Sequence, residues 1–451
     1  MFRIRHYVLS FLLVLSLGAR AAETNSIVWH RASNRVDANV QNETLLPLLG
    51  QIARDTGWRV YVEPGTTKTV SAKFQNLPSS DALRMLLGNL NFMVSPQTNG
   101  PSQLYVFSTV IQKATQLVPA TRVRGRHVPN ELLVKLKPGA NIDALAKLLG
   151  AKVIGRNDKL GIYRLQFADA AATEAALGQL QSDPDVQAVD YNYIYDPPPE
   201  VQPLGESSVP PVSLQLKAPS DSGKIIVGLP DTAVQAQDLP GSLGQFVLSQ
   251  LSVADGTQAN GDTLTHGTAM AETILSSIAM QEQGSSAVQI LPVDVYGSSA
   301  STTSWDVAEG LADAVNNGAN VINMSLGGSG DSSFLDSVIQ SVEQENIPIF
   351  AAAGNNGVST PEYPAAMPGV ISVTAEQQGQ IPSYADFGSW VDVAAPGTSV
   401  VYLGTQPWYV VGTSVSTAYI TGLAAGAEDS THQSWSTIDS AISKAYPVPA
   451  Q

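Results

Sequence analysis

The chain contains no cysteine among its 451 residues. This excludes disulfide bonds, a cysteine nucleophile and thiolate metal sites, so the fold depends on packing alone. Long apolar runs are scarce too, and none beyond the N-terminus approaches the roughly 20 residues that a membrane-spanning helix needs. Hydrophobic residues make up 43% of the chain, which is ordinary for a globular protein. At this length we expect roughly two or three domains.

Basic residues are nearly absent from the second half of the chain. From residue 223 onward Lys224 and Lys444 stand against 21 Asp and Glu, a net charge of −19, whereas residues 1–222 hold 22 basic and 18 acidic groups, a net charge of +4. Nucleic acid and anionic membrane are poor partners for such an acidic surface. The imbalance either serves solubility or lets a basic N-terminal part dock on an acidic C-terminal part.

The first 21 residues have the layout of a secretory signal peptide. Arg3, Arg5 and His6 precede the apolar run YVLSFLLVLSLG, and Ala19-Arg20-Ala21 follows it. The run is too short to span a bilayer comfortably. We therefore expect cleavage after Ala21, export to the periplasm or the medium, and no membrane span.

Two small α+β blocks come next. Residues 26–108 alternate β-like runs with the helical patterns TLLPLLGQIARDTG and SSDALRMLLGNL. This block resembles the short N-terminal domain of secretins and TonB-dependent receptors. Residues 128–195 follow the order β-α-β-α-β, which suggests a ferredoxin-like unit. The Pro-rich stretch 196–217 is interpreted as a linker.

Residues 218–451 predict an α/β domain. KIIVGL, VQILPVDVY, ANVINMSL and IPIFAAA are unbroken apolar runs, typical of strands buried on both faces of a mostly parallel sheet. DVAEGLADAVNN and SFLDSVIQSVEQEN predict helices between them. Sites on such sheets lie at the carboxyl ends of the strands.

Four polar residues stand at strand ends or helix starts of this domain. Asp231 follows IIVGLP, His266 opens THGTAMAETIL, Asn355 follows IPIFAAAG, and Ser414 stands in GTSVSTAYITG. Each has an ordinary alternative role: a turn, a surface cap, a loop residue or a helix N-cap. Their joint occurrence in one sheet indicates a catalytic set.

These residues resemble the motifs of the subtilisin-type serine peptidases. VGLPDTAV is similar to the family's Asp motif, HGTAMAETI to its His motif, VINMSLGG to its substrate strand, AAAGN to its oxyanion motif and GTSVSTAYITG to its Ser motif. The resemblance spans about residues 212–445, and Asp, His and Ser occur in the order known for subtilisin. It implies a subtilisin-like fold and a secreted serine endopeptidase.

The resemblance also implies roles. Ser414 would be the nucleophile, His266 the base and then the acid, and Asp231 the group that orients and stabilises the imidazole. Asn355 and the backbone N–H of Ser414 would hold the oxyanion. No cofactor is expected to be required. Structural calcium has no support, because SSIAMQEQGSS lacks the family's Asn-rich loop, and the metal content is left open.

The specificity pocket can be placed in the same way. One wall would be Ser325, Leu326 and Gly327, which would also pair with the substrate backbone. Ala353 and Gly354 would form the facing wall. Glu362 stands where subtilisins commonly carry a small residue, so a carboxylate at the pocket floor would favour a substrate Lys or Arg. The alternative is that the short loop NNGVSTPEYP turns Glu362 to solvent.

The block at 128–195 is similar to the family's propeptide, an intramolecular chaperone and inhibitor. We expect a precursor that cuts itself in the linker and then acts on polypeptide substrates. Two residues depart from the family pattern: Ala233 replaces a Gly, and Thr417 replaces a Pro.

Other classes of function are weighed against this one. An α/β-hydrolase esterase would need G-x-S-x-G, which GTSVS does not supply. A catalytically weak or inactive homologue could instead act as an envelope binding or signalling protein through its N-terminal domain.

Overall fold

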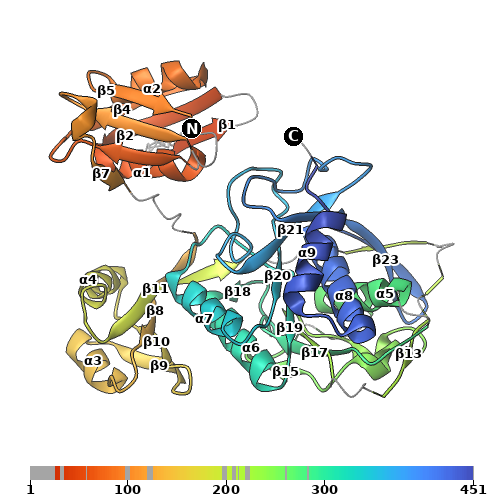
Figure 1. The fold of residues 1–451 in the computed structure, drawn as a ribbon. Coiled ribbons are helices and arrows are strands. Elements are labelled where there is room, and N and C mark those ends of the chain that lie inside the picture. The colour runs from red at the N-terminus through yellow and green to blue at the C-terminus, as the bar shows by residue number, and fades with distance from the viewer. Residues whose placement is uncertain are drawn as a thin grey trace, which may run out of the picture. The chain divides into compact units, whose positions relative to one another are not determined.

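A computed structural model of the chain describes residues 26–30, 35–56, 58–96, 102–118, 125–195, 201–205, 210–211, 213–218, 224–257, 259, 262–281 and 284–449. The predicted signal peptide at 1–21 lies outside these residues. The chain forms two compact units, Met1–Thr121 and Arg122–Gln451, and each is described by itself (Figure 1).

The first unit is an α+β domain with two sheets, ordered β1-β2-β4 and β5-β6-β3-β7. Its elements are β1 (Ser26–His30), β2 (Arg35–Thr44), α1 (Leu45–Thr56), β3 (Arg59–Val62), β4 (Thr69–Pro78), α2 (Ser79–Leu87), β5 (Asn91–Ser95), β6 (Gln103–Phe107) and β7 (Gln116–Val118). Leucines of both helices, such as Leu49 and Leu86, fill a core of its own. Strand β7 pairs with β3 although it lies beyond the predicted boundary at residue 108.

The next segment folds as β8 (His127–Leu136), α3 (Ile142–Leu149), β9 (Lys152–Asn157), β10 (Ile162–Gln166), α4 (Ala170–Leu180) and β11 (Val186–Tyr195). Asn141 and Asp169 cap the two helices by accepting from the N–H groups of Ala144 and Ala172. The sheet order is β11-β8-β10-β9, with β18 (Thr302–Thr303) added beside β11. Strand β9, which the sequence pattern did not reveal, completes the β-α-β-β-α-β order of a ferredoxin-like unit.

The remaining segment is built on a seven-stranded sheet, ordered β15-β17-β14-β19-β20-β21-β22, in which every neighbouring pair is parallel. The strands are β15 (Leu251–Ser252), β17 (Gln289–Asp294), β14 (Ile226–Asp231), β19 (Val321–Met324), β20 (Ile349–Ala352), β21 (Val370–Glu376) and β22 (Val393–Pro396). The helices are α5 (His266–Gln281), α6 (Ser304–Asn316), α7 (Ser333–Glu343), α8 (Thr413–Thr431) and α9 (Trp435–Ala445).

Helices cover both faces of this sheet. Val321 and Phe350 share a core with α5 and α8, whereas their neighbours Ile322 and Ile349 share another with α6 and α7. Successive strand residues point to opposite faces, so strands buried on both sides must be apolar throughout. The predicted mostly parallel sheet with helices on both faces is confirmed.

The predicted linker is held against this domain at two places. Strand β12 (Gln202–Pro203) pairs with β24 (Gln406–Val411), the partner of β23 (Thr398–Leu403), and β13 (Gln215–Leu216) pairs with β16 (Ser285–Ser286). None of the helices within the described ranges combines the length and apolarity that crossing a membrane requires.

Candidate active site

Asp231 and His266 are in direct contact. Asp231 ends β14, His266 begins α5, and the imidazole Nδ1 lies 2.9 Å from Oδ1 and 3.0 Å from Oδ2 of the carboxylate. Both side chains are almost wholly buried, with 6% of His266 and 1% of Asp231 exposed. A carboxylate that accepts the Nδ1 proton leaves Nε2 as the basic nitrogen.

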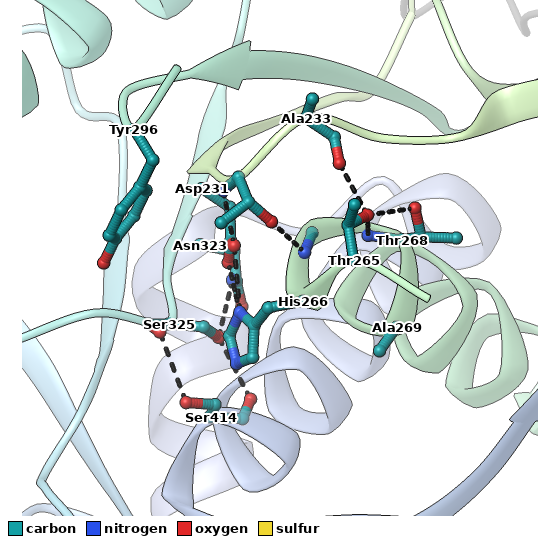
Figure 2. Close-up of polar contacts among 12 residues, drawn as sticks. Asp231, Ala233, Thr265, His266, Thr268, Ala269, Tyr296, Asn323, Ser325 and Ser414 are labelled. Carbon is teal, nitrogen blue, oxygen red and sulfur yellow. Dashed lines mark hydrogen bonds and ion pairs between the residues drawn. The ribbon is translucent and has the colours of Figure 1, made fainter. Parts of the chain in front are cut away.

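Ser414 lies at the start of α8, next to this pair. Its Oγ donates to the carbonyl of Ser325 at 3.2 Å, and the Ser325 hydroxyl donates to the Ser414 carbonyl at 3.0 Å. Figure 2 shows the imidazole of His266 between Asp231 and Ser414. Gly412 precedes the helix with φ of 148°, a conformation that glycine adopts without strain. The turn therefore brings Ser414, Asp231 and His266 together.

Asn355 lies against the same turn. Its side-chain Oδ1 accepts from the backbone N–H of Thr413 at 2.8 Å and from the Thr413 hydroxyl at 3.2 Å. A Cβ atom on Gly412 would lie 3.2 Å from Oδ1, so the glycine permits this close approach. With the carbonyl end of the amide held, its NH2 group is the end that can donate to a developing oxyanion.

Both predicted pocket walls contact the turn that carries Ser414, one through Ser325 and the other through Gly354. Ser325, Leu326 and Ala353 are buried, and the N–H of Gly354 donates to the Thr413 hydroxyl at 3.1 Å. Gly328 and Tyr363 exchange two backbone hydrogen bonds of 2.9 and 2.8 Å. A Cβ atom on Gly327 would lie 3.3 Å from the Tyr363 carbonyl. The segment ending at Tyr363 therefore lies against the wall that contains Gly327.

Glu362, the residue before Tyr363, is half-buried. Its Oε1 accepts from the Asn356 side-chain amide at 3.1 Å. Burial, with a smaller contribution from Asp386, raises the pKa of Glu362 to about 7, and the Asn356 hydrogen bond opposes the shift. These contacts favour the pocket position over the alternative in which the side chain points to solvent.

Two buried carboxyl groups near the site were not predicted from the sequence. Asp294 ends β17 opposite Asp231, and its Oδ1 accepts from the N–H groups of Tyr296 and Gly297 at 3.0 and 2.8 Å. Glu272 lies on α5 and accepts from the Tyr402 N–H at 2.8 Å. Burial raises the pKa of both, that of Glu272 to about 8. Their only sequence signal is an acidic residue inside an apolar run.

The two departures from the family pattern fit locally. Ala233 is buried, and its carbonyl accepts from the Thr265 hydroxyl at 2.7 Å. Thr417 sits inside α8, where its hydroxyl donates to the Thr413 carbonyl at 2.8 Å. Neither disturbs the contact between Asp231 and His266.

Comparison with known proteins agrees with this geometry. The sequence model of the Subtilase family matches residues 222–445, and that of the fervidolysin N-terminal prodomain matches residues 114–192. The chain is 32% identical over 263 residues to the thermostable alkaline protease of Halalkalibacterium halodurans, covering 57% of this chain and 70% of that one. The chain belongs to the subtilase family.

Other subtilases extend the likeness. The thermophilic serine proteinase of Bacillus sp. (strain AK1) is 29% identical over 336 residues, covering 69% of this chain and 81% of that protein. The crystal structure of fervidolysin from Fervidobacterium pennivorans, a keratinolytic enzyme related to subtilisin, has the same fold. It superposes with a TM-score of 0.53 at 19% identity and covers 71% of this chain and 57% of that one. The chain is thus a subtilisin-like serine peptidase with a prodomain.

The last strand of this subtilase's prodomain enters the peptidase domain beside a pocket wall. In β11, Ile194 and Tyr195 pair with Thr303 and Thr302 of β18. Tyr195 is fully buried, and a Cβ atom on Gly328 would lie 2.9 Å from its ring. The glycine thus makes room for an aromatic side chain of the prodomain next to the wall.

Prodomain side chains also bind the starts of two helices. Asp190 accepts from the Ser333 N–H at 2.9 Å, at the N-terminus of α7. Asn192 accepts from the Trp305 N–H at 3.1 Å, near the N-terminus of α6. Helix N-termini carry unpaired N–H groups and a partial positive charge, so these acceptors are well matched to them. In addition, the buried Lys135 ammonium donates to the Ser337 carbonyl at 2.8 Å.

Proposed function

We propose that Asp231, His266 and Ser414 are the catalytic triad of this endopeptidase. The observation that carries the assignment is the 2.9 Å contact between His266 Nδ1 and Asp231, with the imidazole placed between Asp231 and Ser414 (Figure 2). This arrangement leaves Nε2 on the side of Ser414, where a base is needed.

The chemistry follows from these positions. Ser414 Oγ attacks the substrate carbonyl carbon while His266 takes its proton, and the resulting oxyanion accepts from the Asn355 amide and the Ser414 N–H. His266 then returns the proton to the leaving amine as the C–N bond breaks. Water, deprotonated by the same imidazole, hydrolyses the acyl-enzyme and regenerates Ser414. None of these steps needs a cofactor, and structural calcium has no support and is left open.

A fluorophosphonate reagent tests the triad, because it reacts only with an activated serine. The wild type should be labelled and should cleave casein, and Ser414→Ala should do neither. Ser430→Ala, which changes another serine of α8, should behave as the wild type. An unlabelled wild type would instead favour the inactive homologue that acts as a binding or signalling protein.

We infer that residues 128–195 act as an intramolecular inhibitor and chaperone, and that the linker at 196–217 is cut. The position of Tyr195 beside Gly328 and the helix-capping contacts of Asp190 and Asn192 support this role. Residues 196–200, 206–209 and 212 of the linker lie outside the described residues. The partners would be the enzyme's own prodomain and polypeptide substrates, not nucleic acid.

We further infer export, either into the medium or to the periplasm, from the signal-peptide layout of residues 1–21. Residues 26–108 would then serve docking in the cell envelope or regulation, as their resemblance to the secretin and TonB-receptor domain suggests. Their separate core and the exposed side chains of Met85, Met93 and Leu117 in the first unit are consistent with a docking role.

A further inference from the structure

Two carboxyl groups lie directly behind the wall formed by Ala353 and Gly354. Asp386 is fully buried after β21, and Glu362 is half-buried just before Tyr363. A Cβ atom on Gly354 would contact the Asp386 carboxylate and would lie 2.8 Å from Glu362 Cγ. Because Gly354 has no side chain, only its backbone lies between the two carboxyl groups and the pocket.

The two carboxyl groups are held unequally. Asp386 Oδ1 accepts from the backbone N–H groups of Asn356 and Val358 at 2.9 and 2.8 Å. The Asn356 side-chain amide lies 3.4 Å from Asp386 Oδ2 and 3.1 Å from Glu362 Oε1, so one neutral donor serves both groups. Burial raises the pKa of both groups, but several backbone donors oppose the shift at Asp386, whereas only the Asn356 side chain opposes it at Glu362.

Among the residues that the structure describes, no Lys, Arg or His side chain forms an ion pair with Glu362 or Asp386. From residue 223 onward the only Lys and Arg residues are Lys224 and Lys444. A buried carboxylate without a cationic partner is costly, and a ligand that supplies the partner is favoured accordingly.

We propose that Glu362 and Asp386 select a Lys or Arg side chain as the residue on the N-terminal side of the scissile bond. The inference rests on the proposed function, since it assigns a substrate class to the pocket beside Ser414. A long basic side chain that enters the pocket would pair with the carboxyl groups. An apolar side chain would exclude water and leave a charge unpaired, which is how a pocket rejects the wrong substrate.

The preference should also depend on pH. The groups that face Glu362 are Asp386, Asn356 and the prodomain residue Tyr195, whose own pKa is raised mainly by burial and to a smaller extent by Glu362. Because the pKa of Glu362 is raised to about 7, its carboxyl group is mostly neutral below that pH and mostly charged above it. The preference for a basic residue therefore strengthens as the pH rises through neutrality.

Matched peptides that differ only in Lys, Arg, Leu or Phe at this residue test the proposal. Cleavage by the full chain is measured at about pH 5.5 and about pH 8.5, with active sites counted by fluorophosphonate labelling. We expect kcat/KM for Lys or Arg to exceed that for Leu by about tenfold or more at the higher pH, and by less at the lower pH.

Variants separate the proposal from a failure of folding or of the triad. Glu362→Gln should abolish most of the preference and its pH dependence, whereas Glu362→Asp should keep part of both. Glu345→Gln, which changes an exposed glutamate of the same domain, should leave both unchanged. A labelled wild type that prefers Leu or Phe at the higher pH would overturn the inference but not the triad. A wild type that is not labelled would overturn the triad instead.

Discussion

Asp190 of the prodomain accepts hydrogen bonds from both the backbone N–H and the hydroxyl of Ser333, at 2.9 and 3.1 Å. A prodomain residue thus caps a helix of the peptidase domain, since the Asp190 carboxylate on β11 lies at the N-terminus of α7. Replacing such an acceptor typically costs about 1 kcal/mol, more when the acceptor is charged.

Asp190→Asn should therefore weaken the hold of the prodomain while leaving the active site intact. We expect the inhibited full chain to show roughly three- to tenfold more activity early after purification, from a loss of about 1 kcal/mol. Asp185→Asn changes an exposed carboxyl of the same domain and should have no effect. Equal activity of Asp190→Asn and the wild type over the whole time course would contradict the prediction.

Ser414→Ala should accumulate as an uncut precursor. If the linker is cut by the enzyme's own serine, the variant keeps the folded prodomain but has no nucleophile to open the chain. N-terminal sequencing and mass measurement of both proteins check this. Normal maturation of the variant, expressed alone, would show that another peptidase does the cutting.

Residues 26–108 should be dispensable for catalysis. The first unit has a separate core, and the residues assigned to catalysis all lie in the other unit. A chain that starts near His127 should fold and cleave casein at the rate of the full chain. Loss of activity in correctly folded protein would count against a role limited to docking.

Asn355→Ala should lower kcat by roughly 10²- to 10³-fold with little change in KM, a loss known for the corresponding donor of subtilisin. Its amide would donate mainly to the charged intermediate, so substrate binding should change little. The variant also loses the acceptor for the Thr413 N–H, so its thermal unfolding must be compared with that of the wild type. A rise in KM at constant kcat would assign Asn355 to ground-state binding.

Glu272→Gln should stabilise the protein at alkaline pH. The folded-state pKa of Glu272, about 8, exceeds the ordinary value of 4.5 because the side chain is buried. The contribution of Glu272 to stability is therefore fully present below about pH 4.5 and is lost as the pH rises through about 8. A neutral Gln keeps an acceptor for the Tyr402 N–H without a charge to bury.

The measurement is thermal unfolding in the Ser414→Ala background, which prevents self-digestion. The gain in the free energy of unfolding from Glu272→Gln should be roughly 2 to 5 kcal/mol near pH 9 and much smaller near pH 5. The exposed Glu345→Gln serves as the matched control. A gain that does not change with pH would mean that Glu272 is already charged in the folded protein.

The elements that could be predicted from the sequence are those with an unbroken apolar run or a regular helical pattern. Apolar strands such as Val321–Met324 are buried on both faces and cannot carry polar residues, so the polar residues at their ends stand out. Strand β9 (KVIGRN) was missed because it alternates polar and apolar residues at a partly exposed edge. Strand β2 was missed for a similar reason, because it contains many polar residues and pairs with β4 through its backbone.

The candidate site was predictable from the sequence only where its residues belong to local motifs. Asp231, His266 and Ser414 belong to motifs that can be recognised in the chain, and the structure brings them together. Asp386 and Asp294 were not found, because their surroundings depend on which strands become neighbours in the folded sheet. Asp294 faces Asp231 only through the parallel pairing of β14 and β17. Such a relationship has no local signal in the sequence.

The linker strand β12 has a kinetic consequence. Tyr195 is held by β18 on one side, and Gln202 and Pro203 are held by β24, the strand that leads into Ser414. A cut between residues 195 and 202 would leave each new chain end fastened by its own sheet pairing. Cutting of the linker and release of the prodomain are then separate steps, and the slower step sets the rate of activation. Activity would appear after a lag, set by how fast the cleaved ends detach.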